Sequence, residues 1–157
     1  MSALHMVLAT DGSASSLSAA RWVNRMMASQ SVEVVLVSVA TWPDEAWWGI
    51  GGVGMGSEAA LMDFDTIQQL WQASQSRAQA ALKATAAIMP DCSPSEQLVL
   101  TGRPVDALVQ YTQEHHPDLI VVGRRGHIAL GTLVGSVSFA LLQRSTVPVL
   151  VVGEEDP

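Results

Sequence analysis

The chain has 157 residues, which suits one domain with a buried hydrophobic core. Hydrophobic residues make up 48% of it and charged residues 15%, a balance typical of a folded protein rather than a disordered one. The formal net charge is −7, and no group of basic residues exceeds the pair Arg124 and Arg125, so we expect no nucleic-acid partner.

The sequence contains one cysteine, Cys92, which excludes an internal disulfide and a zinc site built from several cysteines. No uncharged apolar run reaches the length of a membrane-spanning helix, so we expect no membrane partner. The first residues, MSALHMVLATDGS, lack the basic start of a signal peptide. We therefore expect a cytoplasmic protein.

The N-terminal part predicts two strands joined by a helix. Residues 4–9 are a short apolar run that ends in the turn sequence Thr-Asp-Gly-Ser, which predicts a strand followed by the start of a helix. Apolar residues then recur at helical spacing, at Ala19, Trp22, Val23, Met26 and Met27. Residues 32–39 are rich in β-branched residues and predict the second strand.

Residues from about 41 to 57 contain three tryptophans and several glycines with no regular period. Such a stretch predicts a long, flexible loop, and long loops in compact domains are often functional. Trp42, Trp47 and Trp48 either shield a ligand or cover the core or a dimer partner. The residues alone do not decide between these alternatives.

The rest of the chain alternates between helices and strands. A helix whose apolar face runs from Ile67 to Met89 ends before Pro90. Further strands and helices are predicted, in chain order, at 96–100 (strand), 105–112 (helix), 118–122 (strand), 136–145 (helix) and 147–152 (strand). This alternation predicts an α/β fold with one open, mainly parallel, five-stranded sheet and helices on both faces.

The last predicted strand differs from the others. Pro148 cannot donate a hydrogen bond to a neighbouring strand, which favours a position at the edge of the sheet. An apolar edge needs a cover, and a second copy of the same strand is the simplest one. We therefore expect a homodimer formed through residues 147–152.

Two loops are candidates for a binding site. In an open α/β sheet, ligands bind beyond the carboxyl ends of the strands, where the winding of the chain reverses. The loop after the first strand carries Asp11, and the loop after the fourth runs from Gly123 to Ser136. If these strands are neighbours, the amides at the start of the helix that follows Gly135 form an anion site facing Asp11.

The glycines of the second loop allow two explanations. Gly123, Gly126 and Gly135 either adopt turn conformations with positive φ, or let another group approach the backbone closely. Asp11 likewise has a structural alternative, as the N-cap of the first helix.

Several of these segments together resemble the universal stress protein family. They are ATDGS near the start, DLIVVG, the G-x-x-G of Gly123 to Gly126, the later Gly-Ser, and VPVLVV near the end. The resemblance spans essentially the whole chain. It implies a single Rossmann-like domain over residues 1–157 with strand order 3-2-1-4-5, and a dimeric sensor or signalling module of the stress response.

The resemblance also implies a bound adenine nucleotide: ATP, or AMP or another such nucleotide, with or without magnesium. Asp11 would lie near the ribose or the metal, and the backbone of Val39 would face adenine. The remaining implied contacts, to the ribose and the phosphates, are Val122, Gly123, Arg125, Gly126, Gly135, Ser136, Val137 and Ser138.

One departure from the family pattern concerns the loop between Gly126 and Gly135. The ATP-binding branch usually has nine residues there, and this chain has eight, His127 to Val134. The loop either absorbs the difference or shifts the start of the last helix.

No catalytic arrangement accompanies these residues. The single lysine, Lys83, lies outside the glycine-rich stretch, and no P-loop sequence occurs. We therefore expect a nucleotide-binding protein and not an enzyme. The alternative is a dimeric interaction module of the same fold that needs no nucleotide.

Overall fold

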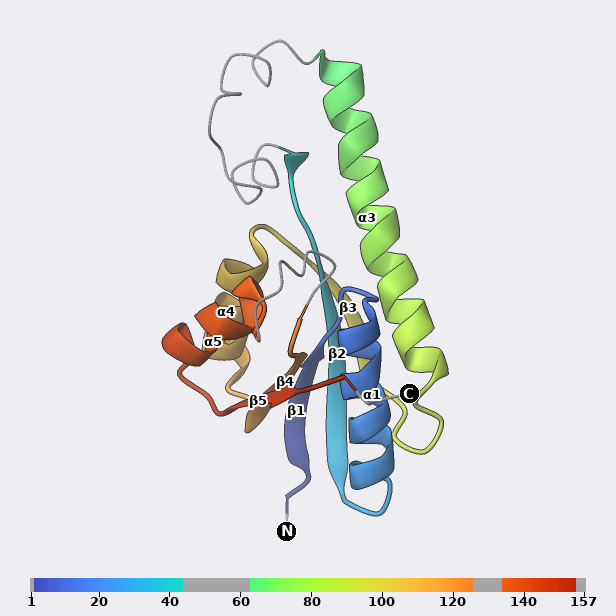
Figure 1. The fold of residues 1–157 in the computed structure, drawn as a ribbon, viewed down its shortest axis with the longest axis vertical. Coiled ribbons are helices and arrows are strands. Elements are labelled where there is room, and N and C mark those ends of the chain that lie inside the picture. The colour runs from blue at the N-terminus through green and yellow to red at the C-terminus, as the bar shows by residue number, and fades with distance from the viewer. Residues whose placement is uncertain (1, 44–62, 126–133, 155–157) are drawn as a thin grey trace.

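The computed structural model describes residues 2–43, 63–125 and 134–154. Within these residues five strands form one parallel sheet in the order β3-β2-β1-β4-β5 (Figure 1). The strands are β1 Leu4–Ala9, β2 Val32–Ala40, β3 Glu96–Thr101, β4 Leu119–Gly123 and β5 Val149–Val152. The parallel sheet and the order 3-2-1-4-5 are therefore confirmed.

Helices cover both faces of this sheet, as the alternating sequence pattern predicts. The described helices are α1 Ala14–Met27, α3 Phe64–Ala87, α4 Pro104–His115 and α5 Ser136–Arg144. Figure 1 shows α1 and α3 on one face and α4 and α5 on the other, with one end of α3 extending beyond the sheet. Most of the predicted loop at 41–57, from residue 44 onward, lies outside the described residues, as does Gly126.

The strands contribute to two hydrophobic cores because successive side chains point to opposite faces. Met6 and Leu8 of β1 pack with residues of α1 and α3, whereas Val7 between them packs with residues of α4 and α5. Cys92 belongs to the first core, where burial raises the pKa of its thiol. Burial of both faces explains why the strand sequences are nearly continuous apolar runs.

The winding of the chain reverses at β1, which lies between β2 and β4. After β1 the chain passes through α1 to β2 on one side, and β4 is reached later on the other side. The loops that follow β1 and β4 therefore run in different directions. A crevice between such loops is the usual ligand site of open α/β sheets.

Strand β5 lies at an edge of the sheet, as predicted, but it begins at Val149 rather than at residue 147. The N–H of Val147 donates to Ser145 Oγ at 3.2 Å, so Val147 belongs to a local turn. The carbonyl of Pro148 accepts from Ile120 N at 3.0 Å and so faces β4. Because backbone groups alternate in direction along a strand, the outer edge presents those of Val149 and Val151, and neither is proline.

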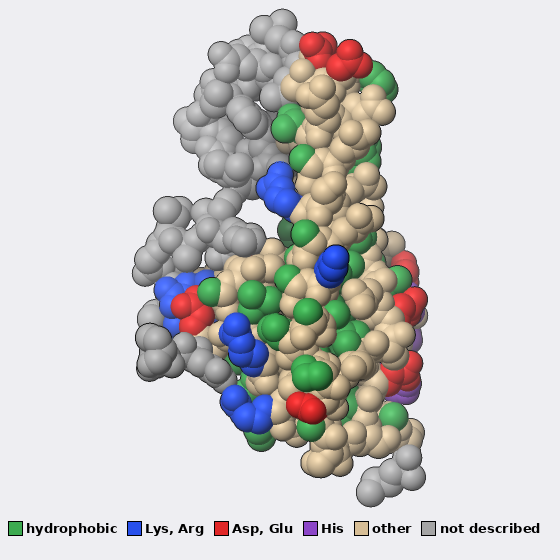
Figure 2. Space-filling view, turned by 90° about the vertical axis from the view of Figure 1, so that its right-hand side faces the viewer, with side chains coloured by type: hydrophobic (Ala, Val, Ile, Leu, Met, Phe, Trp, Pro, Cys, Tyr) green, Lys and Arg blue, Asp and Glu red, His purple; other side chains and the backbone are tan. Residues whose placement is uncertain are grey.

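Charges on the side of the molecule that carries α3 are mixed. Figure 2 shows basic side chains that stand apart from one another, and acidic and histidine side chains along the right-hand edge. None of the described helices has both the length and the apolar character needed to cross a membrane.

Candidate functional site

A cavity of about 370 Å³ lies at the carboxyl ends of β1, β2 and β4, which is within the size range of small-molecule sites. Every predicted site residue that the structure describes lines it, namely Asp11, Val39, Val122, Gly123, Arg125, Gly135, Ser136, Val137 and Ser138. Gly126 lies outside the described residues. Residues far apart in the sequence therefore meet at the predicted place.

The cavity has residues that the sequence interpretation missed. Thr41 follows β2, and Pro104 and Leu108 come from α4, which begins just after β3. The rule that pointed to Asp11, a position just past the carboxyl end of a strand, also applies to Thr41 and Pro104.

The lining of the cavity is of two kinds. The apolar side chains of Val37, Val39, Leu108 and Val122 belong to one hydrophobic core, and we call them the apolar end. The polar residues belong to the starts of α1 and α5 and to the segment after β4, and we call them the polar end: Asp11, Ser16, Arg125, Ser136 and Ser138. A ligand with a flat apolar part and an anionic part suits this division.

The start of α1 is closed by its own side chains. Ser13 is the N-cap, and its Oγ accepts from Ser16 N at 3.3 Å. Asp11 Oδ1 accepts from Ser13 N at 2.9 Å and from Ser16 Oγ at 3.0 Å. The alternative in which Asp11 is the N-cap is therefore wrong, and Asp11 instead holds the turn before the helix and lines the cavity.

The start of α5 is open. Its N-cap is Gly135, which provides no side-chain hydrogen bond, and its first turn contains no acidic residue. Gly135 N donates to Arg124 O at 2.7 Å. The next three residues, Ser136 to Ser138, line the cavity. The first amides of α5, which have no side-chain cap among the described residues, and the positive end of the helix dipole therefore lie at its polar end.

The structural requirement for glycine differs between Gly123 and Gly135, which flank this region. A Cβ on Gly123 would lie 2.6 Å from the carbonyl carbon of Ser15, so here a close approach requires glycine. The approaching group is the backbone of α1 and not a ligand. Gly135 has φ −68° and ψ 161°, which other residues adopt readily. The explanation that Gly135 adopts a turn conformation with positive φ is therefore wrong.

Ser138, one of the predicted phosphate contacts, has a hydrogen-bond partner within the protein. Ser138 Oγ donates to Gly123 O at 2.6 Å, which ties α5 to the end of β4. The hydroxyl proton of Ser138 is therefore used, whereas Ser136 is exposed.

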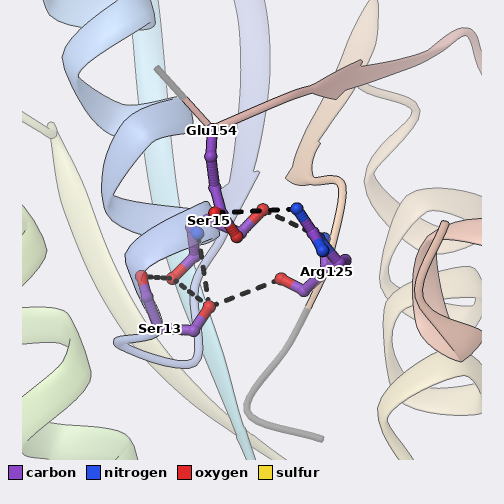
Figure 3. Close-up of polar contacts among 5 residues, drawn as sticks. Ser13, Ser15, Arg125 and Glu154 are labelled. Carbon is purple, nitrogen blue, oxygen red and sulfur yellow. Dashed lines mark hydrogen bonds and ion pairs between the residues drawn. The ribbon is translucent and has the colours of Figure 1, made fainter. Parts of the chain in front are cut away.

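Arg125 is held by both its backbone and its side chain. Its N–H donates to Ser15 Oγ at 2.9 Å, and its carbonyl accepts from Ser13 Oγ at 3.5 Å. Its guanidinium Nη2 lies 3.7 Å from Glu154 Oε2, just after β5 (Figure 3). Serines of α1 thus fix the backbone where the glycine-rich loop begins.

The beginning of the tryptophan-containing segment is attached to α3. Thr41 N donates to Ser74 Oγ at 2.9 Å. Trp42 stacks on Trp71 with ring centroids 4.3 Å apart and planes inclined by 22°. Trp42 therefore has a partner on α3, which the sequence interpretation did not identify. Trp47 and Trp48 lie outside the described residues.

The side chains near the cavity that could ligate a metal limit how a metal could bind. Among the described residues no group of three or more His, Cys, Asp or Glu side chains could hold a metal ion. Of the described residues that line the cavity, Asp11 alone is acidic. Magnesium is often bound by one or two carboxylates together with substrate phosphates, and Asp11 fits only that shared mode.

The model of the universal stress protein family matches residues 4–153 of the chain. A curated relative, universal stress protein Rv1636 of Mycobacterium tuberculosis (strain ATCC 25618 / H37Rv), is 43% identical over 58 residues. That match covers 36% of this chain and 40% of the relative, so it spans less than half of the length of the relative.

Solved structures share the fold at low sequence identity. The hypothetical protein MJ0577 has a TM-score of 0.74 at 18% identity, over 100% of both chains. An Arabidopsis thaliana family protein, At3g01520 with AMP bound, has a TM-score of 0.65 at 17% identity, over 97% of this chain and 92% of its own. A universal stress protein in complex with cAMP has a TM-score of 0.57 at 24% identity, over 99% of this chain and 100% of its own.

Proposed function

The chain belongs to the universal stress protein family, and we propose that its cavity binds an adenine nucleotide. The observation that carries this proposal is the open start of α5, which faces the same cavity as an apolar strand end. A nucleotide has one part for each end: an apolar base and an anionic phosphate.

The base occupies the apolar end of the cavity. Val39 of β2, Val122 of β4 and Leu108 of α4 line the cavity and belong to the hydrophobic core on one face of the sheet. The carboxyl end of β2 offers backbone groups near Val39 for the edge of adenine. Structures of relatives with AMP or cAMP support adenine as the base.

The phosphates occupy the polar end. The amides in the first turn of α5, which the described residues leave without a side-chain cap, donate to phosphate oxygens, and the exposed Ser136 adds a hydroxyl donor. Magnesium, if it binds, is shared between Asp11 and the phosphates, so the metal alone binds weakly or not at all.

The protein binds the nucleotide without efficient hydrolysis. Rapid phosphoryl transfer uses a lysine or equivalent group at the phosphates and a residue that positions the nucleophile. The single lysine, Lys83, lies on α3 and does not line the cavity. A steady turnover of ATP above about 1 per second would contradict this part of the proposal.

The protein acts as a homodimer in sensing or signalling stress, with β5 as the contact. The outward-facing backbone groups of Val149 and Val151 at the edge of the described sheet support this role, because a second edge strand can pair with them. Val151→Pro removes an outward N–H and leaves the bonds to β4 intact. We expect it to give monomers in sedimentation experiments, and a persistent dimer would place the contact elsewhere.

The nucleotide is identified by mass spectrometry of small molecules released from freshly purified protein, followed by calorimetric titration with AMP, ATP, GMP and GTP. We expect an adenine nucleotide in the released fraction and tighter binding of the adenine compounds. A protein that carries no nucleotide and binds none would instead be a nucleotide-independent interaction module. The internal partners of Arg125 and Ser138 are the observation that keeps this second candidate in view.

A further inference from the structure

We propose that Glu154 sets the phosphate-tail preference of this cavity, disfavouring triphosphates relative to monophosphates by competing for Arg125. The inference rests on the proposed nucleotide-binding function and adds a residue that determines specificity. Glu154 does not itself line the cavity. It acts through the guanidinium that would otherwise serve the phosphates.

The ion pair joins two segments of the chain. Arg125 lines the cavity just after β4, and Glu154 follows β5. Arg125 Nη2 and Glu154 Oε2 are 3.7 Å apart, with 29% and 40% of the two side chains exposed. Figure 3 shows the guanidinium turned toward Glu154 and the carbonyl oxygen of Arg125 turned toward Ser13.

The contact is loose enough to be exchanged. Charge-assisted hydrogen bonds between guanidinium and carboxylate are about 2.7–2.9 Å long, so the observed distance of 3.7 Å leaves only a Coulomb attraction. The Nε of Arg125 is buried and has no hydrogen-bond partner in the described part of the chain. Because the ion pair contains no short hydrogen bond and part of the Arg125 side chain is exposed, the outer guanidinium nitrogens keep donors that phosphate oxygens can use. Glu154 competes for this group and does not orient it.

The backbone keeps the carboxylate near the phosphate end. Arg124 N donates to Val152 O at 2.8 Å, which joins the end of β5 to the loop after β4. Ser15 Oγ accepts from Arg125 N at 2.9 Å. The charge of Glu154 therefore stays beside the site when a ligand binds. Its repulsion grows with the charge of the ligand, so ATP is disfavoured more than AMP.

The test is calorimetric titration of the full chain with AMP and ATP at low ionic strength, for the wild type and Glu154→Gln. Glu155→Gln is the matched control, since it removes the same charge at the next residue of the sequence. We expect Glu154→Gln to tighten ATP about threefold to fivefold, the scale of an exposed ion pair, and to change AMP by less than about twofold. Glu155→Gln should change neither by more than about twofold, and added salt should reduce the effect.

An unchanged ratio of ATP to AMP affinity in folded Glu154→Gln would overturn the inference while leaving the proposed function intact. Weaker ATP binding in that variant would also overturn it, because Glu154 would then position Arg125 for the phosphates. If the wild type binds neither nucleotide, the proposed function fails and this inference fails with it. Circular dichroism of each variant verifies the fold.

Discussion

Helices α1 and α5 begin at the same edge of the sheet, yet their first turns are built in opposite ways. Ser13 caps α1 with its side chain, and Asp11 and Ser16 bond to each other beside it. Gly135 gives α5 no side-chain cap at all. The start of α1 is capped by side chains of the protein, whereas the start of α5 has no side-chain cap among the described residues. The proposed phosphate site at α5 rests on this difference, which can be tested by adding a cap to α5 or by removing the cap of α1.

A side-chain cap at the start of α5 should have the largest effect on nucleotide affinity. The φ and ψ of Gly135, −68° and 161°, are those of an ordinary N-cap, so Gly135→Asp can cap the helix. We expect the variant to lose more than about a hundredfold in nucleotide affinity, because its carboxylate accepts from the helix amides and adds a negative charge, while the free energy of unfolding rises by only about 0.3 kcal/mol.

Gly135→Ala is the control for this substitution, because alanine adds a small side chain without a capping group. It should retain much more affinity than Gly135→Asp. Equal losses in the two variants, measured by calorimetry with AMP, would show that bulk and not capping weakens binding.

Removing the hydroxyl of Ser136 should weaken ATP about tenfold to a hundredfold, as expected for a lost hydrogen bond to a charged group. Ser138→Ala is the comparison, since the hydroxyl of Ser138 donates to Gly123 O. It should lower the free energy of unfolding by about 1 kcal/mol. Calorimetry and urea unfolding of both variants separate the two roles. Equal losses of ATP affinity in the two variants would contradict the assignment of Ser136 to the ligand and Ser138 to the fold.

A side chain at Gly123 should disturb α1 rather than the ligand. The Cβ of Gly123→Ala would lie 2.6 Å from the Ser15 backbone, and such overpacking costs about 1–3 kcal/mol of stability. Gly153→Ala is the matched control, because its Cβ would meet only the end of the Arg124 side chain at 4.0 Å. Urea unfolding of both variants gives the difference, and equal stabilities would refute the close-approach explanation.

Opening α1 should have the smallest effect on binding. Ser13→Ala removes the N-cap of α1 and should lower the free energy of unfolding by about 1 kcal/mol. Nucleotide affinity should change little, since the closed helix start donates nothing to the ligand and the contact of Ser13 Oγ with Arg125 O is long, at 3.5 Å. A loss of affinity as large as that of Ser136→Ala would mean that α1 contributes to the anion site.

Periodicity was sufficient to predict the main elements, because apolar runs such as residues 4–9 are local features of the sequence. The carboxyl-end rule pointed to two loops of the cavity, those of Asp11 and of Gly123 to Ser136. The strand order and the contacts of Val39 and Val122 came from the family resemblance. Contacts set by tertiary packing were not predictable in this way. The approach of α1 to Gly123, the pairing of Arg125 with Glu154 and the stacking of Trp42 on Trp71 all join distant segments.

Strand β5, at the edge of the sheet, shows the same limit of prediction from sequence. The sequence placed Pro148 at an edge, but only the register shows that its carbonyl faces β4. Which backbone groups point outward depends on the pairing of β5 with β4, and a one-residue shift would reverse it.

The most direct test is an NMR titration of ¹⁵N-labelled protein with AMP, following the backbone amides of both helix starts. We expect saturable chemical-shift changes that are largest at the amides of Ser136 and Val137 in α5, with much smaller changes at Ser15 and Ser16 of α1. Gly135→Asp should abolish the shifts. Saturable shifts centred on α1, or none at Ser136 and Val137 at millimolar AMP, would contradict the claim that the open start of α5 is the phosphate site.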